Sequence, residues 1–232
     1  MKKMIAEKIL KETEVGYDLI SQKFSQTRKH FWRGLEFIGD YAGEGDSVLD
    51  WGCGNGRLLE LLGGKNIQYF GADVSQRLID LAQQEYSGSD RSFFKINPVQ
   101  SIIPLADNFF NTIYSIAVFH HFPSEKYRQD VVSQLYAKTK KGGCVIVTVW
   151  YLWQRKYFKN ILKNWFEKLQ GKSELDWRDC KISFTDNQGR RFWRFHHAFT
   201  KRELKKLFQQ AGFEIEKCEV VNKRNILLVG RK

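Results

Sequence analysis

The sequence predicts an α/β protein built on a doubly wound, seven-stranded and mostly parallel sheet. Between residues 47 and 150, patterns typical of strands and helices alternate five times. A glycine-rich loop directly follows the first of these strands, where sheets of this kind bind ligands. The chain has 232 residues, of which 42% are hydrophobic, which suits one core domain with an elaboration.

Periodicity and end signals predict the elements of the first 150 residues. Residues 4–42 are expected to be helical, because Tyr17, Ile20 and Phe24 recur at helical spacing. Ser75 and Ser124 are expected to cap two later helices. The expected strands are residues 47–50, 67–72, 92–96, 111–117 and 144–150, and a short helix is expected at 57–62.

After residue 150 the order of the patterns changes. Residues 151–170 are expected to form an aromatic and basic helix, and residues 171–193 to be irregular. Thr200 is expected to cap the last helix. Two apolar runs, 213–220 and 226–229, follow it, and the short joint between them forces an antiparallel pair.

We expect a single domain over residues 1–232, with an N-terminal helical lid at 1–42 and a basic aromatic insertion at 151–193. The charge is uneven along it. Residues 1–150 hold 18 Lys and Arg against 17 Asp and Glu, whereas residues 151–232 hold 20 against 9, so nearly all of the net charge of +12 lies there. A basic region attracts phosphate backbones, which favours a nucleic-acid partner. The alternatives are a solvated basic surface or a patch that lies on a membrane.

Other features exclude several classes of protein. The sequence has no apolar run of about 18 residues, so no membrane span is expected. Its first residues do not resemble a secretory signal, which makes the cytoplasm the expected location. The four cysteines lie far apart and form no CxxC pair, so neither a disulfide framework nor a zinc site is expected.

The loop after the first strand reads Asp50-Trp51-Gly52-Cys53-Gly54-Asn55-Gly56. Glycines at such a place let a ligand approach the backbone. Arg57 stands where a dinucleotide-binding loop would have another glycine, which weakens a nicotinamide-cofactor interpretation. Asp73 ends the second strand and can accept both hydroxyls of a ribose. The set predicts a cofactor that contains a nucleoside.

These residues resemble the class I S-adenosylmethionine-dependent methyltransferase family over residues 45–150, with residues 213–230 as its closing hairpin. The resemblance implies a Rossmann-like methyltransferase fold, with S-adenosyl-L-methionine as the cofactor. It implies that Asp73 holds the ribose and that Asn97 replaces the acid that usually meets the adenine. Tyr17 and Arg28 are expected either to close a lid over the cofactor or to have ordinary structural roles, with Tyr17 in helix packing and Arg28 solvated. The cofactor-binding residues implied are Tyr17, Arg28, Asp50, Gly52, Cys53, Gly54, Asn55, Gly56, Asp73, Val74, Asn97, Ile116 and Ala117.

Three further segments resemble the subfamily that esterifies 5-carboxymethyluridine at the wobble position of tRNA. They are residues 17–28, 115–122 and 194–199, the last followed by Glu203-Leu204. His196 stands where that subfamily usually has an aromatic residue, and Arg33 replaces a common proline. The resemblance implies a tRNA substrate and, from the eukaryotic members, a possible small activator protein.

A carboxylate acceptor is already ionised at neutral pH and needs no general base. Catalysis then requires positioning and removal of water. Arg194 is the expected clamp for the carboxylate, with a phosphate contact or a surface salt bridge as alternatives. His120 and His197 are expected to supply hydrogen bonds near the acceptor, although His120 and its neighbour His121 can equally be structural. No metal site is expected there, because the adjacent histidines lack a nearby third ligand.

The aromatic and basic run over residues 150–165 has three interpretations. It can stack bases and bind phosphates, it can pack as an amphipathic helix, or it can lie on a membrane. The function predicted is therefore a methyltransferase acting on tRNA. The alternatives are a methyltransferase for an acidic small molecule or lipid, and a non-catalytic cofactor-binding subunit of an RNA-modifying complex.

Overall fold

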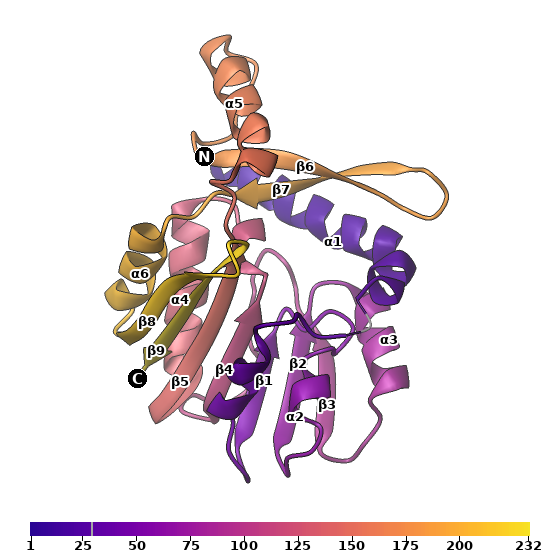
Figure 1. Ribbon diagram of the computed structural model, residues 1–232, viewed down its shortest axis with the longest axis vertical. Helices are drawn as coiled ribbons and strands as arrows, with labels where there is room; N and C mark the ends of the chain where they lie inside the picture. The colour runs from indigo at the N-terminus through magenta and orange to yellow at the C-terminus, as the bar shows by residue number, and fades with distance from the viewer. Residues whose placement is uncertain (29) are drawn as a thin grey trace.

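A computed structural model describes residues 1–28 and 30–232, and confirms the predicted fold class (Figure 1). The main sheet has seven strands in the order β3-β2-β1-β4-β5-β9-β8, and β6 pairs with β7 separately. The strands are β1 Ser47–Trp51, β2 Gln68–Asp73, β3 Arg91–Lys95, β4 Phe110–Ile116, β5 Thr139–Trp150, β6 Asp179–Thr185, β7 Arg191–His197, β8 Glu214–Val221 and β9 Asn225–Arg231. The helices are α1 Lys3–Gln26, α2 Leu59–Leu62, α3 Gln76–Glu85, α4 Glu125–Lys138, α5 Arg155–Leu169 and α6 Lys201–Gln210, with short 3-10 helices at Glu36–Tyr41 and Phe119–His121.

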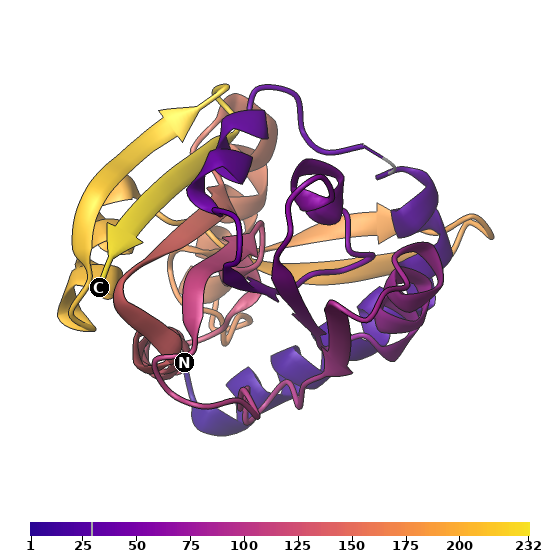
Figure 2. The same ribbon diagram turned by 90° about the horizontal axis from the view of Figure 1, so that it is seen from below.

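The sheet is parallel from β3 to β5 and antiparallel at β9 and β8. Side chains that alternate along β5 enter two separate cores: Val147 packs with α4 and α6, and Ile146 packs with α2 and the first 3-10 helix. Figure 2 shows elements on both sides of the sheet. Because both faces are covered, β1 is buried along its whole length, as the apolar sequence predicts.

The N-terminal helix α1 lies against α3 and ends near the glycine loop (Figure 1). The Asp18 carboxylate accepts hydrogen bonds from the Ser75 hydroxyl at 2.6 Å and the Arg77 backbone amide at 3.2 Å. Ser75 is the N-cap of α3, as predicted, and its hydroxyl also accepts from the Leu78 amide. The start of α3 is therefore attached to α1. None of the described helices is long and apolar enough to cross a membrane.

The prediction of one helix over residues 4–42 is wrong. Helix α1 ends at Gln26, and only residues 36–41 return to a helical turn; position 29 lies outside the described residues. Phe31 and Leu35 turn inward and join the core beneath the sheet, which a continuous solvent-facing helix would prevent. Gly34 has a φ of +81°, a left-handed conformation that interrupts the helix.

The prediction that residues 171–193 are irregular is wrong in part, because only residues 171–178 and 186–190 lie outside strands. Most of the second half of this segment pairs as β6 and β7, from Asp179 opposite His197 to Thr185 opposite Arg191. The ribbon is only two strands wide and is exposed in the half nearer its turn, so polar residues occupy positions there that a buried strand would give to apolar ones. Strand β5 likewise begins at Thr139, earlier than predicted, because Gly142 and Gly143 lie within it.

A buried charged network attaches the β6–β7 hairpin to the main domain. His197 at the end of β7 contacts the Asp179 carboxylate through Nδ1 at 2.7 Å and the Glu203 carboxylate through Nε2 at 2.8 Å. Glu203 lies in the first turn of α6, and Arg178 donates to its other oxygen at 2.8 Å. Burial alone lowers the pKa of His197, but its bonds to the two carboxylates outweigh burial and raise that pKa above the ordinary value. The same contacts overcome the burial of Glu203 and lower its pKa to about 2.

We predict that His197→Gln lowers the free energy of unfolding by about 3–5 kcal/mol near pH 6, because it leaves the buried Asp179 carboxylate without its cation, whereas Glu203 keeps Arg178. The folded-state pKa of His197 is raised, so its contribution is present below about pH 6.5 and is lost as the pH rises through that raised pKa. Urea unfolding at pH 6 and pH 9 measures the difference, which should shrink at pH 9. His30→Gln, at an exposed histidine beside Glu60, is the control and should cost under about 0.5 kcal/mol. A His197→Gln effect of equal size at both pH values would contradict the charged network.

Candidate functional site

The glycine loop is folded tightly against the end of β2. The amides of Gly52 and Cys53 both donate to the Ala72 carbonyl, at 2.7 and 3.0 Å. Gly52 has a φ of +84°, and a Cβ there would lie 2.3 Å from Val118 Cγ2. Gly54 has a φ of +56°. These positions therefore require glycine for conformation and for space.

Two carboxylates lie beneath this loop. Asp73 accepts from the Gly54 amide and from the Ser75 amide, each at 2.9 Å, one bond to each carboxylate oxygen. Burial raises the pKa of Asp73 to about 6 despite these donors. Asp50 accepts from the Tyr69 hydroxyl at 2.8 Å, and burial raises its pKa to about 7. Each oxygen of Asp73 keeps a lone pair that can accept from a ligand hydroxyl.

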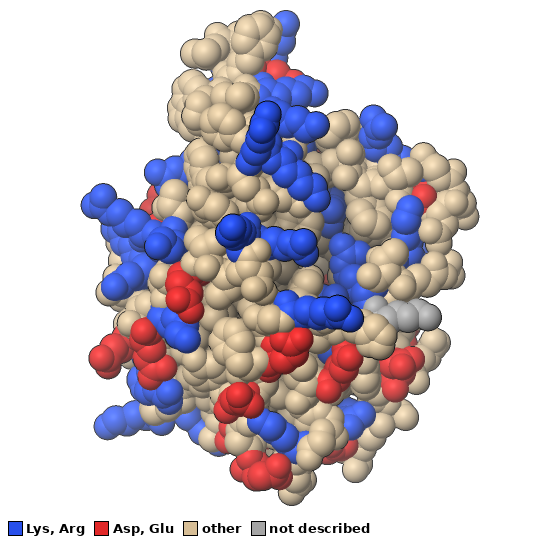
Figure 3. Space-filling view, viewed as in Figure 1, with Lys and Arg blue, Asp and Glu red and all other residues tan. Residues whose placement is uncertain are grey.

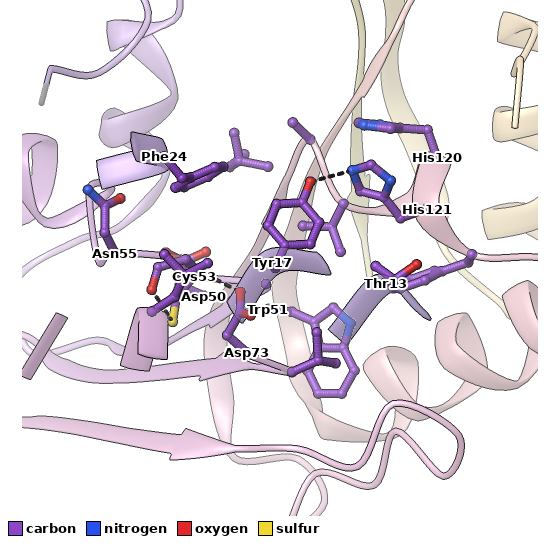
Figure 4. A pocket seen from close by; sticks show the side chains of 18 of the residues that line it. Thr13, Tyr17, Phe24, Asp50, Trp51, Cys53, Asn55, Asp73, His120 and His121 are labelled. Carbon is purple, nitrogen blue, oxygen red and sulfur yellow. Dashed lines mark hydrogen bonds between the residues drawn. The ribbon is translucent and has the colours of Figure 1, made fainter. Parts of the chain in front are cut away.

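A pocket with about 1110 Å³ of atom-free space, open to solvent on one side, lies over the loop. Helix α1 supplies Thr13, Tyr17 and Phe24 to its wall, opposite the loop residues Cys53 and Asn55 (Figure 4). The ends of β4 and β5 also line it, as the position of ligand sites in open parallel sheets predicts.

At the far end of the pocket, polar side chains from three separate segments meet. The Tyr17 hydroxyl is 2.7 Å from His121 Nε2, a contact drawn in Figure 4. Arg194 Nη1 is 3.4 Å from the Tyr17 oxygen, and the guanidinium carbon lies 5.6 Å from the centroid of the Trp150 ring. Arg194 and His120 are buried, and burial lowers the pKa of His120 well below its ordinary value. This end of the pocket combines the Arg194 cation with neutral imidazoles.

The structure brings most of the sequence-predicted residues into this one pocket. Those that line it are Tyr17, Arg28, Asp50, Gly52, Cys53, Gly54, Asn55, Asp73, Val74, Ile116, Ala117, His120 and Arg194. The predicted lid residues Tyr17 and Arg28 are among them. The Arg28 guanidinium carbon lies 4.3 Å from the centroid of the Phe24 ring, and burial lowers the pKa of Arg28.

Three predicted site residues lie elsewhere. Gly56 has a φ of +76° and packs against Ala82 and Tyr86. Asn97 is exposed, and its carbonyl oxygen accepts the Val99 and Gln100 amides, so it serves the local turn rather than the pocket. His197 uses both ring nitrogens in the network that attaches the hairpin, because successive residues of β7 face opposite sides.

Other residues of the site were not predicted. His196 does not itself line the pocket, but it packs behind two residues that do, His120 and Trp150, with its ring centroid 5.2 Å from each of theirs. The alternation of Arg194 and His196 on one strand would have indicated this, but the preceding residues were expected to be irregular. Arg57 lines the pocket with its guanidinium carbon 3.8 Å from the centroid of the Trp32 ring, and burial lowers its pKa to about 10.

A basic arm, which we define as residues 155–197 and which comprises α5, the connection after it and the β6–β7 hairpin, projects beyond the pocket (Figure 1). Lys and Arg gather over the arm side of the face in Figure 3, and most Asp and Glu lie on the opposite half of that face. The exposed cations of the arm include Arg155, Lys156, Lys159, Lys163, Lys181 and Arg191. Phe166, Trp177 and Trp193 are 64%, 51% and 46% exposed, so aromatic rings stand among the cations.

Residues 24–217 match the model of a family described as a methyltransferase domain. A tRNA (carboxymethyluridine(34)-5-O)-methyltransferase of Xenopus tropicalis is 33% identical over 63% of this chain, which spans 22% of that protein. The enzyme of the same name from Schizosaccharomyces pombe is 28% identical, with 86% of this chain and 87% of that protein covered. The chain thus spans less than a quarter of the first of these relatives and most of the second.

Solved structures share the fold. A SAM-dependent methyltransferase from Methanosarcina mazei has a TM-score of 0.70 at 20% identity, with 88% of this chain and 98% of that chain covered. A methyltransferase of Haloferax volcanii, in complex with the Trm112 methyltransferase activator, has a TM-score of 0.61 at 15% identity, with coverage of 91% and 92%.

We predict that Gly52→Ala lowers the free energy of unfolding by about 2–4 kcal/mol, since the new methyl group meets Val118 in addition to the left-handed backbone cost. Gly45→Ala is the matched control, because Gly45 has a φ of +77° and nothing within 4 Å of its added Cβ, and should cost about 1 kcal/mol. Urea unfolding measures both. Equal losses would show that contact with Val118 does not matter, whereas partial recovery in Gly52→Ala with Val118→Ala would support it.

Proposed function

Because the chain belongs to the methyltransferase-domain family, we propose that it transfers a methyl group from S-adenosyl-L-methionine to the carboxymethyl group of a wobble uridine in tRNA. The observation that carries the proposal is one pocket with a glycine loop and Asp73 at one end and buried Arg194 at the other. The names of the relatives supply the acceptor, and the basic arm beside the pocket suits a polyanion.

The residues present fit the cofactor. Asp73 is held by two backbone donors and keeps lone pairs for two ribose hydroxyls. Gly52 and Gly54 leave these two positions of the loop without side chains, so a cofactor can approach the backbone, and their positive φ angles favour glycine there. Ile116 and Ala117 at the end of β4 line the part of the pocket near the methyl donor. When bound, S-adenosyl-L-methionine supplies an electrophilic methyl group on a sulfonium.

The acceptor carboxylate needs orientation and desolvation rather than deprotonation, because its pKa is about 4. Arg194 is buried and can present its Nη groups to the carboxylate. Its contacts with Trp150, and with Phe184 at 5.1 Å from the ring centroid, hold the guanidinium while excluding water. Tyr17 joins the lid to this end through His121, so closing α1 over the cofactor also completes the acceptor side.

The basic arm binds the tRNA away from the reacting group. Its exposed cations neutralise phosphates, and Trp177 and Trp193 offer faces on which unpaired bases stack. Lys163 lies 5.7 Å from the centroid of the Trp193 ring, so cation and aromatic sites alternate on this surface. The hairpin carries both Arg194 and Trp193, which connects RNA binding to the acceptor end of the pocket.

A small activator protein is a further partner that we propose. The similar fold of the Haloferax volcanii methyltransferase that binds Trm112 supports this proposal. Purification of the tagged chain from its source cells, with mass spectrometry of small co-purifying proteins, tests it. Full activity of the isolated chain would contradict the proposal that an activator is required.

We predict that Asp73→Ala weakens S-adenosylmethionine binding at least about 100-fold, because two hydrogen bonds to a buried carboxylate are lost. Arg194→Ala should keep cofactor affinity within about threefold and lower kcat/KM for tRNA at least about 100-fold. Calorimetric titration with S-adenosylhomocysteine and transfer of labelled methyl to tRNA measure the two effects. A fully active Arg194→Ala variant would contradict the acceptor-side role, and failure of the native chain to methylate any tRNA would contradict the proposed function.

For the arm, we predict that Lys156→Ala with Lys159→Ala weakens tRNA binding about 10-fold at 0.1 M salt. Loss of two phosphate contacts should also reduce the slope of log affinity against log salt by about 2. The charge-matched control is Lys205→Ala with Lys217→Ala, on the exposed faces of α6 and β8 at the other side of the molecule (Figure 1). Filter binding measures both. Equal salt slopes for the two variants would contradict tRNA binding by the arm. So would a result in which the arm variant binds anionic vesicles more weakly but binds tRNA as the native chain does.

A further inference from the structure

Two arginines, Arg28 and Arg57, line the pocket beside the glycine loop. The loop connects them to the ribose site, because the Gly54 amide donates to the Asp73 carboxylate at 2.9 Å. A Cβ on Gly54 would lie 3.3 Å from the Phe24 ring, and the Arg28 guanidinium carbon lies 4.3 Å from the centroid of that ring. Arg28 is thus separated by one aromatic ring from the loop residue that holds Asp73.

The Arg57 guanidinium lies in an aromatic corner of the same pocket. Its carbon is 3.8 Å from the centroid of the Trp32 ring and 5.8 Å from that of Phe31, and both rings line the pocket. Within the described part of the chain, its only hydrogen bond runs from Nη1 to the His30 carbonyl at 3.4 Å. An arginine has five N–H donors, so most of those of Arg57 remain for a ligand.

Neither guanidinium forms an ion pair with a carboxylate among the residues that the structure describes. The two acids whose charge acts on Arg57, Asp50 and Glu60, are each hydrogen-bonded to other groups. Arg28 and Arg57 repel each other, and burial together with this repulsion lowers the pKa of Arg57 to about 10. A buried cation without a counter-ion is strongly destabilising, so the two arginines indicate an anionic ligand.

The chemistry of the cofactor supplies such an anion. S-adenosyl-L-methionine carries one anionic group, the carboxylate of its methionine part, and a guanidinium presents paired N–H donors that match a carboxylate. An RNA phosphate is the other anion that the proposed reaction brings to the pocket. The Arg57 side chain is 8% exposed, so a polymer backbone reaches it less readily than a small ligand that lies along the loop.

We propose that Arg57 binds the carboxylate of the methionine part of the cofactor, with Arg28 as a second cation, and so selects ligands that carry this carboxylate. The proposal rests on the proposed function, because it takes the cofactor to be S-adenosyl-L-methionine. The Trp32 and Phe31 rings hold the guanidinium in place through cation–π contacts. Arg57, which stands where a dinucleotide-binding loop has glycine, then has a role in recognising this cofactor.

The test compares two ligands in calorimetric titrations of the full chain. One is S-adenosylhomocysteine, and the other is its decarboxylated analogue, in which hydrogen replaces the carboxylate. The native chain should bind the first at least about 100-fold more tightly, because the analogue leaves both arginines without an anion and brings an ammonium group to them. Arg57→Met keeps an apolar stem against Trp32. It should bind S-adenosylhomocysteine at least about 10-fold more weakly, and the analogue no more weakly than the native chain does.

Two further variants serve as controls. Arg33→Met, at an exposed arginine of the same segment, should keep the native affinities for both ligands. Arg57→Lys keeps a cation and should restore most of the preference for S-adenosylhomocysteine. Urea unfolding without ligand separates binding from a structural role. Arg57→Met should be at least as stable as the native chain, because it removes a buried cation that has no counter-ion.

The same preference for S-adenosylhomocysteine in Arg57→Met and in the native chain would overturn the inference and leave the proposed function intact. If that variant were also less stable without ligand, the role of Arg57 would be structural. Weaker tRNA binding by Arg57→Met with unchanged affinity for S-adenosylhomocysteine would overturn it as well, and would assign the corner to an RNA phosphate. If the native chain binds neither ligand, the proposed function and this inference both fall.

Discussion

The carboxylate of Asp73 joins the parts of the structure that form the pocket. One oxygen accepts from the loop after β1 and the other from the first residue before α3. That residue, Ser75, is in turn hydrogen-bonded to Asp18 on α1. The glycine loop, the end of β2, helix α3 and helix α1 therefore meet at the buried Asp73 carboxylate. Burial raises its pKa to about 6, and the backbone donors keep the carboxylate in the ionised form that a ribose hydroxyl needs.

The two ends of the pocket differ in electrostatics. The loop end contains the acids Asp50 and Asp73 together with the guanidinium groups of Arg28 and Arg57. The acceptor end contains Arg194 beside neutral imidazoles, and no carboxylate lies among these groups. Arg28 approaches this end as well, since both guanidinium groups lie over the Phe184 ring.

Two adjacent histidines of β7 illustrate how burial and partners decide a role. His197 contacts two carboxylates, and its pKa is raised. His196 contacts aromatic rings and a backbone carbonyl, and its pKa is lowered. The first attaches the hairpin to α6, and the second packs against His120 and Trp150, because successive side chains of a strand point to opposite sides. The hairpin thus holds both a stabilising cation and an uncharged packing ring, one residue apart.

The sequence by itself determined the order of strands and helices over residues 47–150, the glycine loop and the role of Ser75. These are local properties, because periodicity, caps and positive φ angles depend on neighbouring residues. It also indicated Asp73 and Arg194, whose residue types match the chemistry of a ribose and an anion. Asn97 and His197 show the limit of predicting roles from residue type alone. The Asn97 side chain is bonded within a local turn, and the His197 side chain forms an ion pair with a residue that only the folded chain brings close.

Only the tertiary structure decided which residues share the acceptor end of the pocket. His120, His196 and Trp150 come from distant segments, and their rings meet because β5 and the hairpin both reach the same edge of the sheet. No pattern along the chain encodes these contacts between distant segments. Local chemistry therefore predicted the cofactor side of the pocket, whereas long-range packing produced its acceptor side.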